Sequence, residues 1–188
     1  METTVLLERV VDETTRIVDD VADDQLANAS PCDGWTVRDV INHITAGATM
    51  FAVSAEQGAL PDDVFARLMG DNLGDDHRAA WGAASRRAVE AFGQPGVLDR
   101  TVTLPFGTMP AGVALTIAVF DLAVHACDIA QATGQAIGDE DTFAAALEVG
   151  RQIVTDDLRQ PGLFDPAQPV ADVAPLQERM LAFAGRRV

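Results

Sequence analysis

Apolar residues recur at every third or fourth position over most of the chain, a spacing that is typical of helices with one buried face. The pattern predicts five longer helices. These run from about Thr3 to Ala27, Thr36 to Gly58, Asp75 to Phe92, Pro110 to Thr133 and Asp139 to Leu158. Glycine and proline stand between several of these stretches, because both residues end regular helices. The fourth helix is the most apolar, so we expect it to be the most buried.

Shorter elements complete the predicted fold. The stretch Arg100–Phe106 is rich in β-branched residues and precedes Gly107, which indicates a short strand or hairpin between Val97 and Met109. Short helices are expected around Val64 to Met69 and from Leu176 to Ala184. The sequence therefore predicts an all-α bundle with a hairpin or extended segment before its fourth long helix.

The composition narrows the class of protein. With 188 residues, 48% of them hydrophobic, the chain fits one domain with a substantial core. A net charge of -16 excludes a basic surface for nucleic acid and disfavours binding to an anionic membrane. No apolar run approaches the roughly 20 residues of a membrane span, and the N-terminus lacks the apolar region of a leader peptide. With only 2 cysteines, no disulfide framework is expected either, so the cytoplasm is the expected location.

Asp121 and His125 are the first candidates for chemistry, because they stand four residues apart on the most apolar predicted helix. This spacing puts both side chains on one face. A carboxylate and an imidazole so placed can reach one ion at about 2.0–2.2 Å. A hydrogen bond between the two within the helix is the simpler interpretation. Burial shifts the balance towards a shared partner, because an unpaired buried polar group costs about 1–3 kcal/mol.

His43 is the third candidate ligand. The chain has 3 histidines, and two of them, His43 and His125, lie in the middle of apolar helical segments. A single histidine in such a place is more often a packed or surface residue. Two histidines and one carboxylate from facing helices, however, make an open metal site of a kind that suits zinc or ferrous iron. The remaining histidine, His77, follows the polar stretch Gly74–Asp76, and we expect it to be exposed.

Residues near these candidates have simpler interpretations. Asp128 lies one turn beyond His125 and can orient its imidazole or form a local hydrogen bond, and a structural role is favoured. Cys32 can act as a nucleophile or a ligand, but a free cysteine is more often a small buried apolar residue, as we also expect for Cys127. Trp35 is expected to anchor its loop to the core.

Two stretches around the candidate ligands resemble one known family. Pro31-Cys-Asp-Gly-Trp-Thr-Val-Arg-Asp-Val-Ile-Asn-His43 resembles the first-ligand motif of DinB-like proteins related to the N-terminal domain of mycothiol-dependent maleylpyruvate isomerase. Asp121-Leu-Ala-Val-His-Ala-Cys-Asp-Ile-Ala-Gln-Ala-Thr-Gly134 resembles the second motif of the same family. The tail, Phe183–Arg187, is similar to an actinobacterial branch described as metal-binding. The resemblance covers nearly the whole chain.

The resemblance implies a DinB-like four-helix bundle, with residues 1–188 as a single metal-binding domain. It also implies His43, Asp121 and His125 as ligands of a divalent metal, with zinc favoured and nickel or iron as alternatives. The isomerase has glutamate where this chain has Asp121. Because aspartate is shorter by one methylene, we expect the ion to lie nearer this helix. The isomerase also has a C-terminal domain that contributes to its active site and that this chain lacks, so we do not expect maleylpyruvate isomerase activity itself.

The leading hypothesis is a thiol-dependent transferase or isomerase in which the metal favours a thiolate. Mycothiol is the expected thiol, because all 13 basic residues are arginine, a bias that points to an actinobacterial source. The expected partner is a small electrophile, whose anionic group Arg38 can steer, although a solvated Arg38 is favoured. A non-catalytic metal-binding or ligand-sensing protein is the alternative, an iron-dependent oxygenase is a third hypothesis, and the null is a bundle without metal. Both a monomer and a homodimer fit the sequence.

Overall fold

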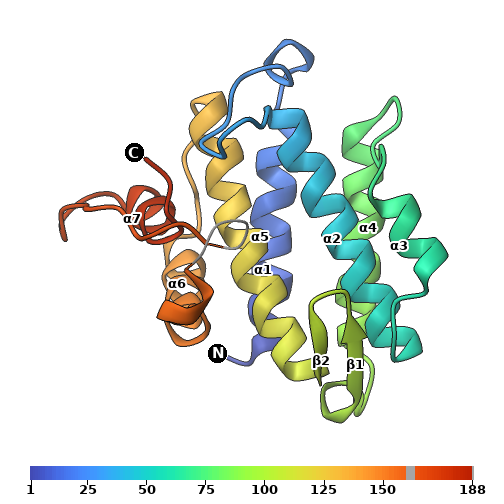
Figure 1. Ribbon diagram of the computed structural model, residues 1–188. Coiled ribbons are helices and arrows are strands. Elements are labelled where there is room, and N and C mark those ends of the chain that lie inside the picture. The colour runs from blue at the N-terminus through green and yellow to red at the C-terminus, as the bar shows by residue number, and fades with distance from the viewer. Residues whose placement is uncertain (160–163, 188) are drawn as a thin grey trace.

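A computed structural model of the protein describes residues 1–159 and 164–187. Four long helices lie side by side in a bundle (Figure 1). They are α1 (Thr3–Asp19), α2 (Val37–Gln57), α4 (His77–Phe92) and α5 (Ala111–Thr133). Helix α2 packs against α4 and α5, and α1 covers the same two helices. The predicted all-α fold is therefore confirmed.

Shorter elements surround the bundle (Figure 1). Helix α3 (Asp62–Leu68) follows α2, and strands β1 (Thr101–Leu104) and β2 (Gly107–Pro110) form the predicted antiparallel hairpin before α5. Helices α6 (Glu140–Ile153) and α7 (Leu176–Phe183) pack beside α5, and their buried side chains join the same hydrophobic core. Single 3-10 turns lie at Asp23–Gln25, Val97–Asp99 and Asp156–Leu158.

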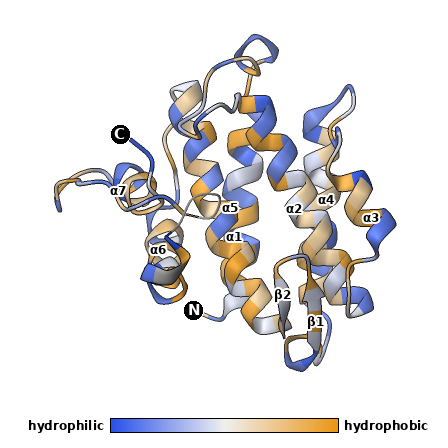
Figure 2. Cartoon of the chain, in the orientation of Figure 1, coloured by the Kyte–Doolittle hydropathy of each residue, from blue (hydrophilic) through white to orange (hydrophobic). Residues whose placement is uncertain are grey.

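Helix α5 is the central element of the fold. It is apolar along most of its length (Figure 2), and 78% of its most hydrophobic window is buried inside the protein. With 23 residues and a mean hydropathy of 1.8 in that window, it is long and apolar enough to cross a membrane. The expectation that no segment reaches this length was therefore wrong. The other helices cover α5, so its hydropathy is explained by its place in the core, consistent with a soluble protein.

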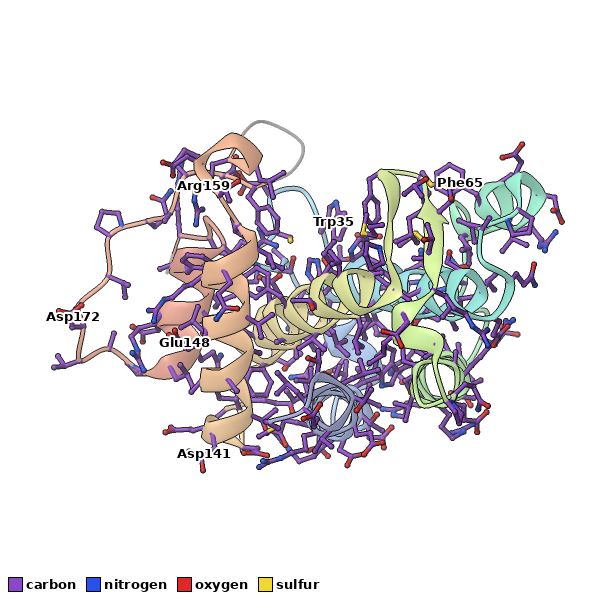
Figure 3. All side chains as sticks on the ribbon, turned by 90° about the horizontal axis from the view of Figure 1, so that it is seen from below. Trp35, Phe65, Asp141, Glu148, Arg159 and Asp172 are labelled. Carbon is purple, nitrogen blue, oxygen red and sulfur yellow. The ribbon has the colours of Figure 1, made fainter. Side chains whose placement is uncertain are left out.

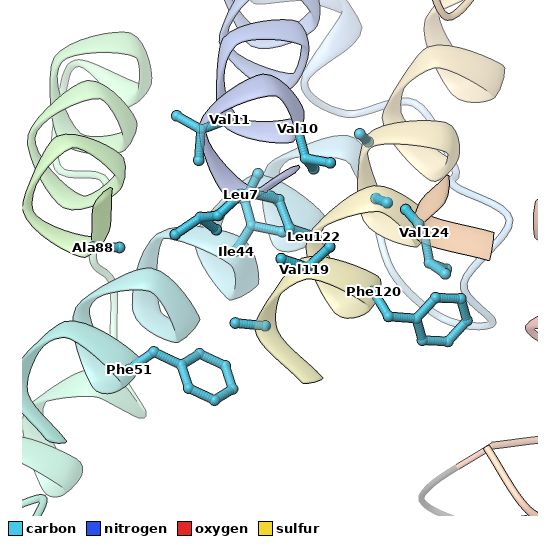
Figure 4. Close-up of a cluster of buried hydrophobic side chains, with 14 of the residues drawn as sticks. Leu7, Val10, Val11, Ile44, Phe51, Ala88, Val119, Phe120, Leu122 and Val124 are labelled. Atoms are coloured by element: carbon cyan, nitrogen blue, oxygen red, sulfur yellow. The ribbon is translucent and has the colours of Figure 1, made fainter. Parts of the chain in front are cut away.

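Side chains from all four long helices interlock around α5 (Figure 4). Val10 of α1, Ile44 of α2 and Ala88 of α4 are buried in one cluster with Val119 and Phe120 of α5. Because burying an aliphatic side chain contributes about 1.5–3 kcal/mol, this cluster supplies much of the stability that holds the helices at fixed distances. The functional side chains of α2 and α5 are therefore presented by a rigid framework.

Two helices are shorter than the sequence pattern predicts. Helix α1 ends at Asp19, eight residues before Ala27, and four aspartates lie between positions 19 and 24. Negative charges oppose the negative end of the helix dipole, so they favour termination there. Helix α6 ends at Ile153 rather than Leu158, where the β-branched pair Val154-Thr155 precedes two further acidic residues. The apolar periodicity continues past both ends and hides these local signals.

The prediction that His77 is exposed was wrong. It lies in the first turn of α4 and is 4% exposed, with Nε2 buried and without a hydrogen-bond partner. The next residue, Arg78, donates from Nε to the backbone oxygen of Asp19 at 3.0 Å, and this contact docks the start of α4 against the end of α1. The polar sequence around His77 gave no sign of this long-range contact.

Candidate metal centre

Helices α2 and α5 bring the three candidate ligands together. His43 projects from α2, while Asp121 and His125 project from the facing side of α5. The Nε2 atoms of His43 and His125 each lie 3.6 Å from a different oxygen of Asp121. The two imidazole centroids are 4.7 Å apart. Thus the potential ligand atoms of all three residues lie within 4.8 Å of one another.

The spacing of these atoms fits a divalent ion. Both histidine–carboxylate distances of 3.6 Å exceed the usual hydrogen-bond range of about 2.7–3.2 Å. Ligands on one tetrahedral zinc at about 2.0–2.1 Å lie roughly 3.3 Å apart. The two histidine–carboxylate distances are close to this separation. The simpler interpretation, a hydrogen bond between Asp121 and His125, does not match the distance.

Asp128 fixes the orientation of the His125 ring. Its carboxylate is fully buried, and its Oδ2 lies 2.9 Å from Nδ1 of His125. A carboxylate only accepts, so Nδ1 carries the proton and Nε2 keeps its lone pair directed towards Asp121. The sequence allowed two interpretations of Asp128, a residue that orients His125 or one that forms a local hydrogen bond. The structure shows that a single hydrogen bond does both.

Arg186 neutralises the buried charge of Asp128. Its guanidinium donates to both carboxylate oxygens, from Nε at 3.3 Å and from Nη2 at 3.2 Å. Burial raises the pKa of Asp128, but the hydrogen bond from His125 and the charge of Arg186 outweigh this effect and lower it. Sequence reasoning assigned no role to Arg186. A buried aspartate requires a cation, but 13 arginines were candidates and 58 residues separate this pair.

The charges at the site favour an ionised Asp121. Burial raises its pKa, but the two neighbouring histidines outweigh burial and lower the pKa to about 2. Burial in turn lowers the pKa of His43, but the attraction of the Asp121 carboxylate outweighs burial, so that the net shift of this pKa is upward. In the absence of an ion, a proton on His43 is the natural partner of Asp121. A cation therefore competes with a proton for this position.

The loop before α2 covers the ligands. Asn28 donates from its side chain to the backbone oxygen of Ala132 at the end of α5, and its own backbone oxygen accepts from the N–H of Val37 at the start of α2, so the loop is held at both helices. The half-exposed Trp35 ring lies 5.1 Å from the His43 ring and 6.0 Å from the His125 ring. The expected role of Trp35, anchoring the loop to the core, was wrong, because its indole forms a wall of the site instead.

The two cysteines occupy different environments. Cys127 is fully buried in the core, as predicted. Cys32 is half-buried on the wall of the site, and its Sγ lies 3.5 Å from Oδ2 of Asp128. Burial and the charge of Asp128 raise the pKa of Cys32 to about 12, so this side chain is a thiol that donates to the carboxylate. Its expected role as a simple apolar filler is therefore incomplete.

Cys32, His125 and Asp128 form a second group with ligand-like spacing. Asp128, however, already accepts hydrogen bonds from His125 and Arg186, and a neutral thiol is a poor metal ligand. The group around His43 has free lone pairs instead. We therefore place the candidate metal centre at His43, Asp121 and His125.

A cavity of about 900 Å³ opens in front of the three ligands. Its walls come from the loop before α2, the stretch that begins at Phe164, and the C-terminal tail. The lining residues include Pro31, Cys32, Trp35, Phe164, Gln168, Arg186 and Arg187. Arg38 is not among them, because its guanidinium donates to Asp71, in the segment between α3 and α4, at 3.1 Å. The hypothesis that Arg38 steers an anionic group at the site is therefore not supported.

Comparison with protein families gives the relationship of the chain. A family described as the mycothiol maleylpyruvate isomerase N-terminal domain matches residues 7–130. The chain belongs to this family. The matched segment contains His43, Asp121 and His125, whereas Arg186 lies outside it. The family resemblance predicted from the two motifs is confirmed.

Relatives of this isomerase-domain family extend the comparison. An uncharacterized protein of Mycobacterium tuberculosis is 31% identical over 187 residues, which cover 96% of each chain. The crystal structure of the mycothiol-dependent maleylpyruvate isomerase has a TM-score of 0.56 at 18% identity, over 77% of this chain and 67% of the isomerase. A DinB-like protein of Bacillus subtilis has a TM-score of 0.54 at 14% identity, over 80% and 93% of the two chains. At such identities these structures confirm the predicted DinB-like four-helix bundle.

Proposed function

We propose that this member of the isomerase-domain family is a cytoplasmic, metal-dependent thiol transferase or isomerase. His43, Asp121 and His125 bind one divalent ion, for which zinc is favoured and nickel or iron are alternatives. Mycothiol is the proposed thiol, since the isomerase of the same fold depends on it according to its name. A small electrophile is the proposed acceptor.

The observation that carries this proposal is the openness of the site. The side chains of His43 and Asp121 are 40% and 36% exposed, and both face the cavity of about 900 Å³. An ion on three protein ligands keeps further coordination positions, and here those positions face a space large enough for a thiol. A purely structural metal site has no need of such an open face, so this geometry favours catalysis over a purely structural role for the metal.

A divalent ion in this site would supply a thiolate at neutral pH, because coordination deprotonates a thiol. The side chains of the chain do the rest. Asp128 holds the His125 ring in one orientation, and the Trp35 indole lies beside both imidazole rings. Their rigid placement lowers the entropy cost of bringing thiol and acceptor together.

The proposed reaction needs no reactant besides the thiol and the acceptor. The thiol loses its proton to solvent, and the sulfur electron pair forms a bond to the electrophilic carbon of the acceptor. In a transferase, the leaving group departs with the electron pair of its broken bond. In an isomerase, sulfur adds to a conjugated double bond, the former double bond rotates, and sulfur then departs with its electron pair.

Metal content measured by mass spectrometry tests the site, on protein purified without chelators or a histidine tag. We expect close to one ion per chain in the wild type and a loss of most of it in His43→Ala and Asp121→Ala. His77→Gln is the matched control, because it removes the remaining histidine at a position outside the site. Metal-free wild type that takes up neither zinc, nickel nor iron would refute the proposal.

Activity distinguishes the proposed function from a sensing role. We expect thiol-dependent consumption of a model electrophile such as chlorodinitrobenzene by the metal-loaded protein, and a loss of it in Asp121→Ala. In cobalt-substituted protein, the thiol should also change the visible spectrum. Metal binding with an unchanged cobalt spectrum and no turnover would favour the sensor instead.

A further inference from the structure

A second cavity, of about 550 Å³, lies on the other side of His43, between α2 and α3. We propose that it binds the apolar, uncharged part of the acceptor, so that the acceptor and the thiol approach the site from different sides. This inference rests on the proposed function, because it names the class of acceptor for the same centre. The volume falls within the range of about 300–1,000 Å³ that is typical of small-molecule pockets.

The two cavities share a wall at the candidate metal centre. Both are lined by His43 and Trp35. From His43 the floor of the second cavity continues along α2 through Ala46, Gly47 and Met50, which lie on one helical face at intervals of three and four residues. A molecule that occupies this floor therefore reaches His43 at one end.

The lining of this cavity selects against anions. Besides the candidate ligand His43, two polar residues line it and both are already bonded: Asp39 accepts from the Thr36 hydroxyl at 2.6 Å, and the Asn42 oxygen accepts from the backbone of Asn72 at 2.7 Å. The described residues that line this cavity include no arginine or lysine. The negative charge of Asp39 repels anions. An apolar, neutral group is therefore the ligand whose transfer from water into this cavity costs the least free energy.

Exposed apolar side chains surround this cavity. Phe65 and Met69, which lie in α3 and at its end, are 40% and 73% exposed and both line the cavity. Figure 3 shows Trp35 and Phe65 on the same side of the bundle, opposite α1. Methionine and aromatic side chains adapt to varied apolar ligands. The described α3 residues include no buried side chain, so the wall that carries Phe65 has room to adjust to an occupant.

Gly47 keeps the floor of the cavity open. Glycine inside a helix costs about 1 kcal/mol relative to alanine, and such a glycine usually relieves close packing. A Cβ atom at Gly47, however, meets no heavy atom within 4 Å. Packing therefore does not require glycine at this position. The lack of a side chain at Gly47 instead leaves open space in front of α2.

Binding of a neutral fluorescent probe, N-phenyl-1-naphthylamine, tests the inference with and without chelator treatment. We expect saturable binding, weakened at least tenfold by Gly47→Leu, which fills the cavity and should leave the thermal midpoint equal or higher. Phe65→Ser/Met69→Ser should weaken binding as well. Val64→Ser is the matched control, because Val64 lies on the same helix but lines a different cavity.

The outcomes separate this inference from the proposed function. Probe binding that Gly47→Leu leaves unchanged, or that Val64→Ser weakens equally, overturns the inference even if metal and thiol turnover are present. Retained, Gly47-dependent binding in a protein that takes up no metal supports the apolar cavity and refutes only the metal-based function.

Discussion

Removing the Arg186 guanidinium should strongly destabilise the protein, although this residue lies near the end of the chain. The Asp128 carboxylate is fully buried, and Arg186, at 17% side-chain exposure, is its cationic partner. In Arg186→Met the methylene contacts are largely kept, whereas the charge, two hydrogen bonds to Asp128 and one to the backbone oxygen of Ala184 are lost. The carboxylate then remains in the core with only His125 and the Cys32 thiol as donors.

The expected magnitude follows from this geometry. Breaking a buried ion pair by removing one partner costs about 3–5 kcal/mol. Because Arg186 is partly exposed and Asp128 keeps its hydrogen bond from His125, we expect the lower end, about 3 kcal/mol. The pair Arg151–Glu148 on α6 provides the control, since its side chains are 49% and 62% exposed. Arg151→Met should cost no more than about 0.5 kcal/mol.

Urea unfolding, followed by circular dichroism, measures both free energies of unfolding on chelator-treated protein. The double variant Asp128→Asn/Arg186→Met should recover at least about 1 kcal/mol relative to Arg186→Met alone, because the uncompensated buried charge is gone. If Arg186→Met costs no more than Arg151→Met, or if the double variant recovers nothing, then Arg186 does not compensate Asp128 and the account of the site is wrong.

Three further predictions concern residues outside the ligand set. Burial lowers the pKa of His77 below 6.5, so the free energy of unfolding should fall as the pH drops below about 6.5. His77→Met should remove part of this loss, which thermal unfolding between about pH 7.5 and pH 5 will measure. Gly150→Ala should destabilise by about 1–3 kcal/mol in urea, although alanine favours helices, because its Cβ would overlap the buried Phe120 ring. Cys32, with a pKa of about 12, should react with iodoacetamide at pH 7.5 at least about a hundredfold more slowly than in unfolded protein, and equal rates would contradict its contact with Asp128.

Much of the fold could be predicted from local sequence patterns. The long helices, the hairpin and the last helix all appear, because apolar periodicity and turn residues act over a few positions. Helix α2 begins with a capping box, in which Asp39 accepts from the Thr36 hydroxyl and backbone N–H. Spacing on one helix likewise placed Asp121 and His125 on a common face.

The parts of the site that depend on distant segments could not be predicted. The pairing of Asp128 with Arg186 and the burial of His77 result from contacts between elements far apart in the chain. The residues close to Asp128 and His77 in the sequence do not indicate these distant contacts. The position of Trp35 against two imidazoles also depends on how its loop is tied to both α2 and α5.

The candidate ligands and the walls around them are built into different parts of the molecule. His43, Asp121 and His125 stand on core helices, whereas the loop at Cys32, helix α3 and the tail at Arg187 line the cavities from outside the bundle. Surface segments tolerate sequence change far better than packed helices do. Paralogues can therefore diverge in the molecules that their cavities admit while they keep the same candidate ligands, and a new specificity can arise without a new core.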